Sequence, residues 1–360
     1  MHRHQTLSEY RNILVIILKH IGDVLVATPV FTALKEAYPR SHLSVLVDRG
    51  TEDMVTLNPA VDEVIILDRA EDAPLFARFF RQAAFAVNLR RKRFDLVLEL
   101  SAGDRGAFLG FFTGAPERIG FEPKKRTFLG RHHAFTRLVR ISTTTQHMVD
   151  YNLSVVRALG IEHSEKRLSI FWSKEDSKAC KELMSENGLC ESEPYVVMHP
   201  TSRWLFKAWN SRGYASVCDY IAEKYGIPVV VTSAPDKKEK KRVEEIFSFV
   251  KSRPINLSGM LSLKQLAFCI SKSILFIGVD SAPMHIAAAV GTPIIVLFGP
   301  SGDHMWGPRG NGHIVIKKGW PCQPCGRDGC NGSKISQCLE AITPEEVYLA
   351  VDQKLKGISC

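Results

Sequence analysis

The sequence predicts a two-domain α/β protein in which each domain has a parallel β-sheet with helices on both faces. The chain has 360 residues, more than one ordinary hydrophobic core accommodates. In both halves, short runs of Val, Ile and Leu alternate with segments of helical periodicity, which is the pattern of doubly wound folds. We therefore expect domains at 1–170 and 171–342, followed by a C-terminal helix at 343–360 that can pack back on the first domain.

The apolar runs predict strands and the periodic segments predict helices. In the first half, strands are expected at 12–18, 43–47, 64–67 and 96–100, and helices at 24–38, 73–93 and 148–159. In the second half, strands are expected at 195–198, 228–231, 275–279 and 294–298, and helices within 174–193 and at 211–224, 237–250, 284–290 and 344–356. Ligands of such sheets bind at the carboxyl ends of the strands, so two facing halves predict a cleft between domains.

The segment 278–301 predicts a site for an anionic ligand. Asp280 and Ser281 are both favourable N-caps for the short helix that follows, and Pro283 stands where a first-turn proline is tolerated. The N–H groups at this helix start point toward the edge of the sheet where phosphates bind. His285, one turn into the helix, can donate to a phosphate or a ribose; the alternative is a structural histidine.

The composition is that of a soluble globular protein with an excess of positive charge. Hydrophobic residues make up 45% of the chain, charged residues 24%, and the net charge is +9. This charge favours a nucleic acid, an anionic membrane face or a phosphorylated substrate as partner. The sequence contains no apolar run of roughly 20 residues and no N-terminal signal-peptide core, so we expect a cytoplasmic protein. The dinucleotide and P-loop motifs are absent, which argues against redox chemistry and P-loop hydrolysis.

The first expected strand ends at a turn that contains Gly22 and Asp23. Glycine lets the backbone turn sharply and approach a ligand. The carboxylate of Asp23 would lie at the carboxyl end of the strand, where it can accept a proton from an attacking hydroxyl. The alternative is a simple helix N-cap.

Loops at the same edge of the second half bring hydroxyls and cations together. Thr201 and Ser202 follow its first strand, and Arg203 and Lys207 add positive charge. Lys207 suits a diphosphate leaving group, whose negative charge grows in the transition state. The alternative is a surface loop whose cations extend into solvent.

Three further positions are candidates for holding a nucleoside. Ser233 and Asp236 lie in the loop after the strand at 228–231, where a base or a ribose can bind. Met260 can lie against an adenine; the alternative is ordinary core packing.

Four cysteines are closely spaced near the C-terminus: Cys322, Cys325, Cys330 and Cys338. Their type and number resemble a structural zinc knuckle, although the spacings differ from the usual ribbon. The alternative is a set of reduced thiols in a loop. Four thiolates leave zinc no open position, so we do not expect a reaction centre there, and no other cofactor is expected.

Together these motifs resemble the lipopolysaccharide heptosyltransferases of glycosyltransferase family 9, which are inverting enzymes that use ADP-heptose. The resemblance covers nearly the whole chain and rests on the segments 19–23 with 28–29, 118–121, 200–209, 233–236 and 278–300. The form of segment 200–209 is most like the branch that adds the third heptose. The family implies a GT-B architecture, with the acceptor held by the N-terminal Rossmann-like domain and the nucleotide sugar by the C-terminal one.

The resemblance also implies roles for individual residues. It implies that Asp23 is the general base and that Lys207 binds the diphosphate. The implied donor site consists of Thr201, Ser202, Ser233, Asp236, Met260, Asp280, Ser281, Ala282 and His285. Family members often have Gly at the position of Ala282, so the approach of the backbone to a ligand is slightly restricted here. The implied acceptor side consists of Gly22, Arg118, Lys124, Lys125 and Arg126.

The implied reaction is transfer of L-glycero-D-manno-heptose from ADP-heptose to the inner core of lipopolysaccharide. The lack of an Asp-x-Asp metal motif fits the metal-free members of this architecture. The basic segments 78–93 and 124–126 would face a phosphorylated lipid core at the anionic inner membrane surface, which makes the protein peripheral; the alternative for each is a solvated face.

Two other functions remain open at this point. One is a related transferase with another nucleotide sugar or acceptor, and the other is a non-catalytic anion- or nucleic-acid-binding protein. We expect no nucleic acid partner, because the basic residues are not interleaved with stacking aromatics and no RNA-binding motif is present.

Overall fold

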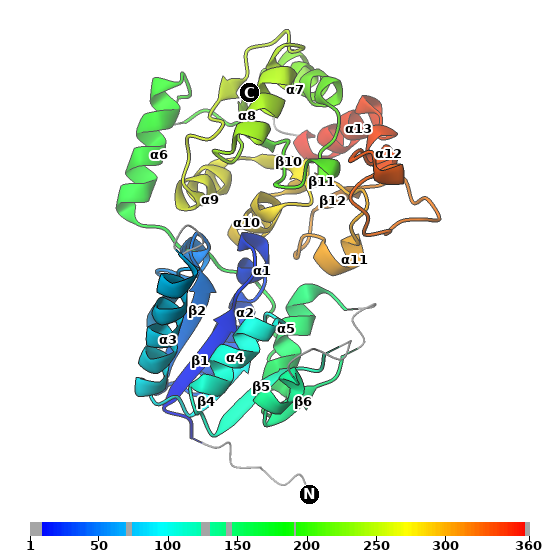
Figure 1. The fold of residues 1–360 in the computed structure, drawn as a ribbon. Helices are drawn as coiled ribbons and strands as arrows, with labels where there is room; N and C mark the ends of the chain where they lie inside the picture. The colour runs from blue at the N-terminus through cyan, green and yellow to red at the C-terminus, as the bar shows by residue number, and fades with distance from the viewer. Residues whose placement is uncertain (1–8, 70–73, 124–129, 142–145, 191, 357–360) are drawn as a thin grey trace, which may run out of the picture. The chain divides into compact units, whose positions relative to one another are not determined.

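The computed structural model describes residues 9–69, 74–123, 130–141, 146–190 and 192–356, and the chain divides into two compact units (Figure 1). The first unit is Met1–Phe171 and the second is Trp172–Cys360. Each contains one six-stranded parallel sheet. The division falls one residue from the boundary predicted at 170/171.

The sheet of the first unit has the strand order β3-β2-β1-β4-β5-β6. Its strands are β1 (Asn12–Ile17), β2 (His42–Asp48), β3 (Glu63–Leu67), β4 (Leu96–Glu99), β5 (Glu117–Phe121) and β6 (Arg137–Val139). The winding direction reverses between β1 and β4, and ligands of doubly wound sheets bind outside the carboxyl ends of the two strands at such a switch point. The apolar pattern does not predict β5 and β6, because β5 begins with Glu117 and Arg118 and β6 has only three residues.

The helices of the first unit form two packed pairs. These pairs are α2 (Thr28–Ala37) with α5 (Met148–Arg157), and α3 (Leu75–Arg91) with α4 (Asp104–Phe112); two short 3-10 helices, η1 (Glu52–Met54) and η2 (Arg131–Ala134), complete the unit. The single helix predicted at 24–38 is wrong, because the chain forms α1 (Ile21–Leu25) and then α2. Pro29 has no N–H for the carbonyl of Leu25, and the Thr28 hydroxyl donates to that carbonyl instead, at 2.8 Å.

The sheet of the second unit has the order β12-β11-β10-β7-β8-β9, which is the same winding as in the first unit. Its strands are β7 (Val196–His199), β8 (Val229–Val231), β9 (Ile255–Asn256), β10 (Leu275–Val279), β11 (Ile294–Leu297) and β12 (Ile314–Ile316). The switch point lies between β7 and β10. Two doubly wound parallel sheets confirm the predicted α/β, Rossmann-like class.

The longer helices of the second unit form two packed groups. The first group is α7 (Ser211–Tyr225), α8 (Lys237–Phe247) and α13 (Pro344–Leu355), and the second is α6 (Lys174–Glu186), α9 (Leu263–Lys272) and α10 (Ala282–Val290). The short helices are η3 (Leu205–Lys207), α11 (Asp303–Trp306), η4 (Cys330–Gly332) and α12 (Gln337–Glu340). Within the described ranges, no helix combines the length and the apolar character that a membrane crossing needs.

The C-terminal helix α13 is part of the second unit. It packs against α7 and against β11 and β12. The structure therefore assigns the helix predicted at 343–360 to the second unit and not to a separate segment. The reason is the inward row Val347, Val351 and Leu355, which is buried in the core of the second unit.

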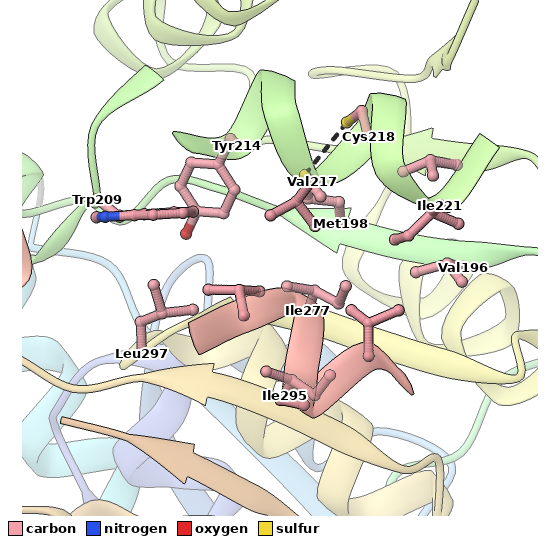
Figure 2. Packing of buried hydrophobic residues seen from close by; sticks show 14 of the residues in the cluster. Val196, Met198, Trp209, Tyr214, Val217, Cys218, Ile221, Ile277, Ile295 and Leu297 are labelled. Atoms are coloured by element: carbon pink, nitrogen blue, oxygen red, sulfur yellow. Dashed lines mark hydrogen bonds between the residues drawn. The ribbon is translucent and has the colours of Figure 1, made fainter. Parts of the chain in front are cut away.

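The core of the second unit fixes the chain that leaves β7 (Figure 2). Trp209 is fully buried, packs edge to face on Tyr214 at 5.2 Å between ring centroids, and donates from Nε1 to the carbonyl of Ile342 at 3.0 Å. Cys218 of α7 faces Met198 of β7, with 3.6 Å between the sulfur atoms. These contacts hold both ends of the 200–210 loop, so its polar residues stay at the carboxyl edge of the sheet.

Candidate functional site

The two strands at the switch point of the second unit each deliver one charged side chain. Lys207 lies in η3 after β7, and Asp280 follows β10 directly. The Lys207 Nζ atom lies 2.7 Å from Asp280 Oδ2 and donates to it. The Asp280 side chain is only 7% exposed, whereas that of Lys207 is 24% exposed. The structure therefore brings together two predicted residues at the edge where doubly wound sheets bind their ligands.

The start of helix α10 lies immediately beside this ion pair. Ser281 is its N-cap residue, but the Ser281 side chain makes no capping hydrogen bond and its hydroxyl donates to the Val279 carbonyl, at 3.3 Å. Ala282 and Pro283 form the first turn. A helix start without a side-chain cap offers backbone N–H groups to an anion, and the helix dipole favours negative charge there.

His285 does not lie on the surface of the protein. It is buried on α10, and its ring lies edge to face with Trp306 at 6.2 Å between centroids. The packing of α10 therefore fixes the position of the imidazole one turn beyond the predicted anion site.

A buried polar network connects the β7 loop to helix α8. Thr201 donates to the Glu239 carboxylate at 2.6 Å, and its hydroxyl lies 3.4 Å from His199 Nε2. The other ring nitrogen of His199, Nδ1, lies 2.9 Å from the Thr232 hydroxyl. Burial lowers the pKa of His199 from 6.5 to about 3, so the imidazole is neutral at physiological pH. Glu239, His199 and Thr232 were not predicted from the sequence, although the position of His199 at the end of a strand was a usable signal.

The loop after β8 carries the remaining predicted nucleoside contacts. Asp236 caps α8 by accepting from the N–H groups of Lys238 and Glu239, at 2.8 and 3.3 Å. Ser233 is buried, and its carbonyl accepts from the N–H of Gly259 at 3.0 Å, which holds the following Met260 beside this loop. The Met260 side chain is 48% exposed, so the alternative of core packing does not apply to it. An exposed thioether next to a polar loop is a suitable contact for a flat base.

In the first unit, Asp23 lies at the carboxyl end of β1, as predicted. It is in the first turn of α1 and forms an ion pair with Lys19, at 3.6 Å. The loop after β4 is held beside the end of β1, because the Leu18 N–H donates to the Ser101 hydroxyl at 2.7 Å. Gly22 lies inside α1 with a helical backbone, so the turn does not depend on a left-handed glycine.

Arg118 does not lie at this edge. It is the second residue of β5 and pairs in register with Val97, toward the amino end of the sheet. Its guanidinium donates to the carbonyls of Ala134, at 2.7 Å, and Ala115, and lies over the Phe111 ring. This placement argues against the predicted acceptor contact and indicates a structural role.

The other three predicted acceptor residues, Lys124, Lys125 and Arg126, lie outside the described residues.

The four clustered cysteines differ in their surroundings. Cys322 and Cys325 are exposed, and Cys338 is buried. Burial raises the pKa of the Cys338 thiol, with smaller contributions from Cys330 and Cys325. Within the described ranges, no three His, Cys, Asp or Glu side chains are grouped so that they hold a metal ion. The predicted structural zinc therefore stays a prediction.

Two doubly wound, Rossmann-like units, one with an ion pair and an uncapped helix start at its switch point, have the α/β architecture that is common among nucleotide-binding proteins. The model of glycosyltransferase family 9 (heptosyltransferase) matches residues 82–336, and the chain belongs to this family.

The relatives agree with that assignment. The chain is 32% identical to lipopolysaccharide heptosyltransferase 3 of Escherichia coli, over 93% of this chain and 96% of that protein. Among solved structures, a family 9 glycosyl transferase from Veillonella parvula superposes with a TM-score of 0.84 at 25% identity, over 97% of this chain and 98% of that one. The E. coli ADP-heptose lipopolysaccharide heptosyltransferase II superposes with a TM-score of 0.78 at 20% identity, over 96% and 98% of the two chains.

Proposed function

We propose that this glycosyltransferase transfers L-glycero-D-manno-heptose from ADP-heptose to the inner core of lipopolysaccharide, with inversion at the anomeric carbon. The observation that carries the proposal is the Lys207–Asp280 pair beside the uncapped start of α10. A cation and a helix start at a switch point suit a nucleoside diphosphate. The 32% identical relative, a lipopolysaccharide heptosyltransferase 3, supports addition of the third heptose.

In this proposal the second unit holds the donor. Lys207 and the first N–H groups of α10 bind the diphosphate, and Ser202 lies on the same edge for the sugar. Thr201 is fully buried and donates to Glu239, so it supports this loop from within. When the bond between the anomeric carbon and the diphosphate oxygen breaks, the leaving ADP gains negative charge. A positive side chain and a helix N-terminus stabilise that charge without a metal ion.

Asp23 of the first unit is the general base. Its carboxylate takes the proton of the acceptor hydroxyl as the hydroxyl oxygen bonds to the anomeric carbon, and the electron pair of the breaking bond leaves with ADP. Lys19, 3.6 Å from Asp23, keeps the carboxylate at the end of β1 and offers a contact to a phosphorylated acceptor.

The test is an assay of ADP release and of product mass with a panel of nucleotide sugars and a heptosylated core acceptor. ADP-heptose should be the productive donor. Transfer from a different nucleotide sugar in preference to ADP-heptose would favour the related-transferase alternative.

The Asp23→Asn variant tests the base. It should lower the rate of transfer by roughly 10²–10⁴-fold while ADP binding stays unchanged, because the amide cannot accept the proton. A matched control is Glu182→Gln on α6, which removes an i,i+4 ion pair with Lys178 of similar length, 3.7 Å. Transfer at the parent rate in D23N would remove Asp23 from this role.

We further propose that the protein works at the cytoplasmic side of the inner membrane as a peripheral protein. Its net charge of +9 is attracted by anionic lipid headgroups.

A further inference from the structure

Helix α3 (Leu75–Arg91) presents an apolar face to solvent. Phe76, Phe79 and Phe80 are 76%, 70% and 54% exposed, and Val87 is 50% exposed. Phe80 contacts both other rings, at 4.5 Å from Phe76 and 5.9 Å from Phe79 between centroids. We call the three phenylalanines the α3 aromatic face. A contiguous exposed cluster of this kind marks an interaction surface, whereas single exposed apolar residues do not.

This face is not the side of the helix that packs on the sheet. Leu89 is buried in the core of the first unit, and Phe85 packs against the same core. Helix α3 therefore has two apolar sides. One packs against the core of the first unit, and the other is exposed to solvent. An ordinary amphipathic surface helix has only the first.

Every charged residue of helix α3 itself is basic. The segment 75–93 contains no Asp or Glu and six basic residues: Arg78, Arg81, Arg90, Arg91, Lys92 and Arg93. Lys92 pairs with Glu63, whereas the side chains of Arg81 and Arg91 are exposed. Aromatic side chains with flanking arginines are the composition of helices that lie in a membrane interface.

The topology of the first unit places the aromatic end of α3 at the carboxyl edge of the sheet. β3 ends at Leu67 on that edge, and α3 follows after a short connection. Ile66, Leu67 and Asp68 line one cavity together with Arg81, Gln82 and Phe85, so the middle of α3 lies at the end of β3 and its first turns lie toward the carboxyl edge. This is the edge at which Asp23 lies.

We infer that α3 docks the protein on an anionic bilayer by inserting Phe76, Phe79 and Phe80 into the boundary between headgroups and acyl chains. Arg81 and Arg91 then contact lipid phosphates. The inference deepens the proposed function and rests on it for the lipid-bearing acceptor. The inferred contact with the membrane depends only on the residues of α3. Docking at the carboxyl edge of the first unit brings the general base to the side from which a membrane-anchored acceptor arrives.

Binding of the full chain to vesicles tests the inference. The parent should sediment with mixed phosphatidylcholine–phosphatidylglycerol vesicles. The triple variant F76Q/F79Q/F80Q should lower the partition coefficient at least about tenfold, because three phenyl rings no longer enter the interface. The variant R81Q/R91Q should lower it by roughly tenfold or more at low salt and much less on pure phosphatidylcholine.

A matched control separates docking from general stickiness. Leu349 on α13 is 70% exposed, and Leu349→Gln should leave the partition coefficient unchanged. All replaced side chains are exposed, so equal thermal midpoints are expected. Parent-like vesicle binding by the triple variant would overturn the inference. The inference would also be overturned if the parent protein were a dimer and the triple variant were a monomer that still binds vesicles. The α3 aromatic face would then contact a second copy.

Activity on two acceptors distinguishes this inference from the proposed function. The triple variant should transfer heptose to a water-soluble core oligosaccharide at the parent rate. Its transfer to the lipid-bearing acceptor in vesicles should fall with its vesicle binding. Equal loss on both acceptors counts against docking, whereas a parent inactive on both acceptors counts against the proposed function and leaves the vesicle measurement valid.

Discussion

Replacing Lys207 and replacing Asp280 should lower the free energy of unfolding by different amounts. At 2.7 Å and an effective dielectric constant of about 20, the attraction between the charges is about 6 kcal/mol before desolvation is counted. The net effect of each substitution depends on which charge is left behind. Asp280 is almost fully buried, whereas Lys207 can reach water.

Lys207→Met should therefore destabilise the fold by about 3 kcal/mol, because it leaves a buried carboxylate without its cation. Asp280→Asn should cost about 1 kcal/mol, because the lysine ammonium regains water and the amide still accepts a hydrogen bond. The double variant K207M/D280N should cost less than K207M alone. Urea unfolding of the four proteins measures the free energies and the coupling between the two sites.

The same variants test the donor site by calorimetric binding of ADP. K207M should weaken binding roughly 10- to 100-fold, which is the value of a charge-assisted contact to phosphate. D280N should lose less, because it retains the cation. Equal destabilisation by both single variants, or parent-like ADP affinity in K207M, would refute the reasoning.

Two further predictions concern buried groups. The pKa of His199 is about 3 in the folded protein, so below pH 6.5 the unfolded chain takes up a proton that the folded chain does not. Stability should therefore fall between pH 6.5 and 3, by about 2 kcal/mol at pH 5, and His199→Gln should flatten the slope of urea midpoints against pH; identical slopes would contradict the assignment. In timed alkylation read by mass spectrometry, the exposed Cys322 should react fast, and the buried Cys338, whose thiol pKa is raised, should react last of the four clustered cysteines. Shared protection that a chelator removes would instead indicate metal bound by the cysteine cluster.

Much of the site could be predicted from the sequence because parallel sheets collect their functional residues in a regular way. Each strand ends at one edge, so Lys207 and Asp280, 73 residues apart, were expected at the same edge before any contact was known. The same reasoning located Asp23 after the first strand. Residues that follow predicted strands were therefore predictable.

Residues whose role depends on partners from other elements were not predictable in this way. Glu239 lies on α8 as one of several charged residues, and only the fold buries it against Thr201, whose hydroxyl also lies near His199. Arg118 resembled an acceptor contact by its motif. Its position near the amino end of β5 became clear only from the register with Val97.

The sequence by itself determined the alternation of strands and helices, the two-domain α/β class and the sheet edge at which the candidate site lies, because these follow from local periodicity and the geometry of parallel sheets. The tertiary structure decided which polar groups are buried together, that α13 packs in the second unit, and that α3 has an aromatic face toward solvent. The physical reason is that periodicity shows which residues of a helix are apolar. Whether an apolar side meets a sheet or water depends on the neighbours that folding brings to it.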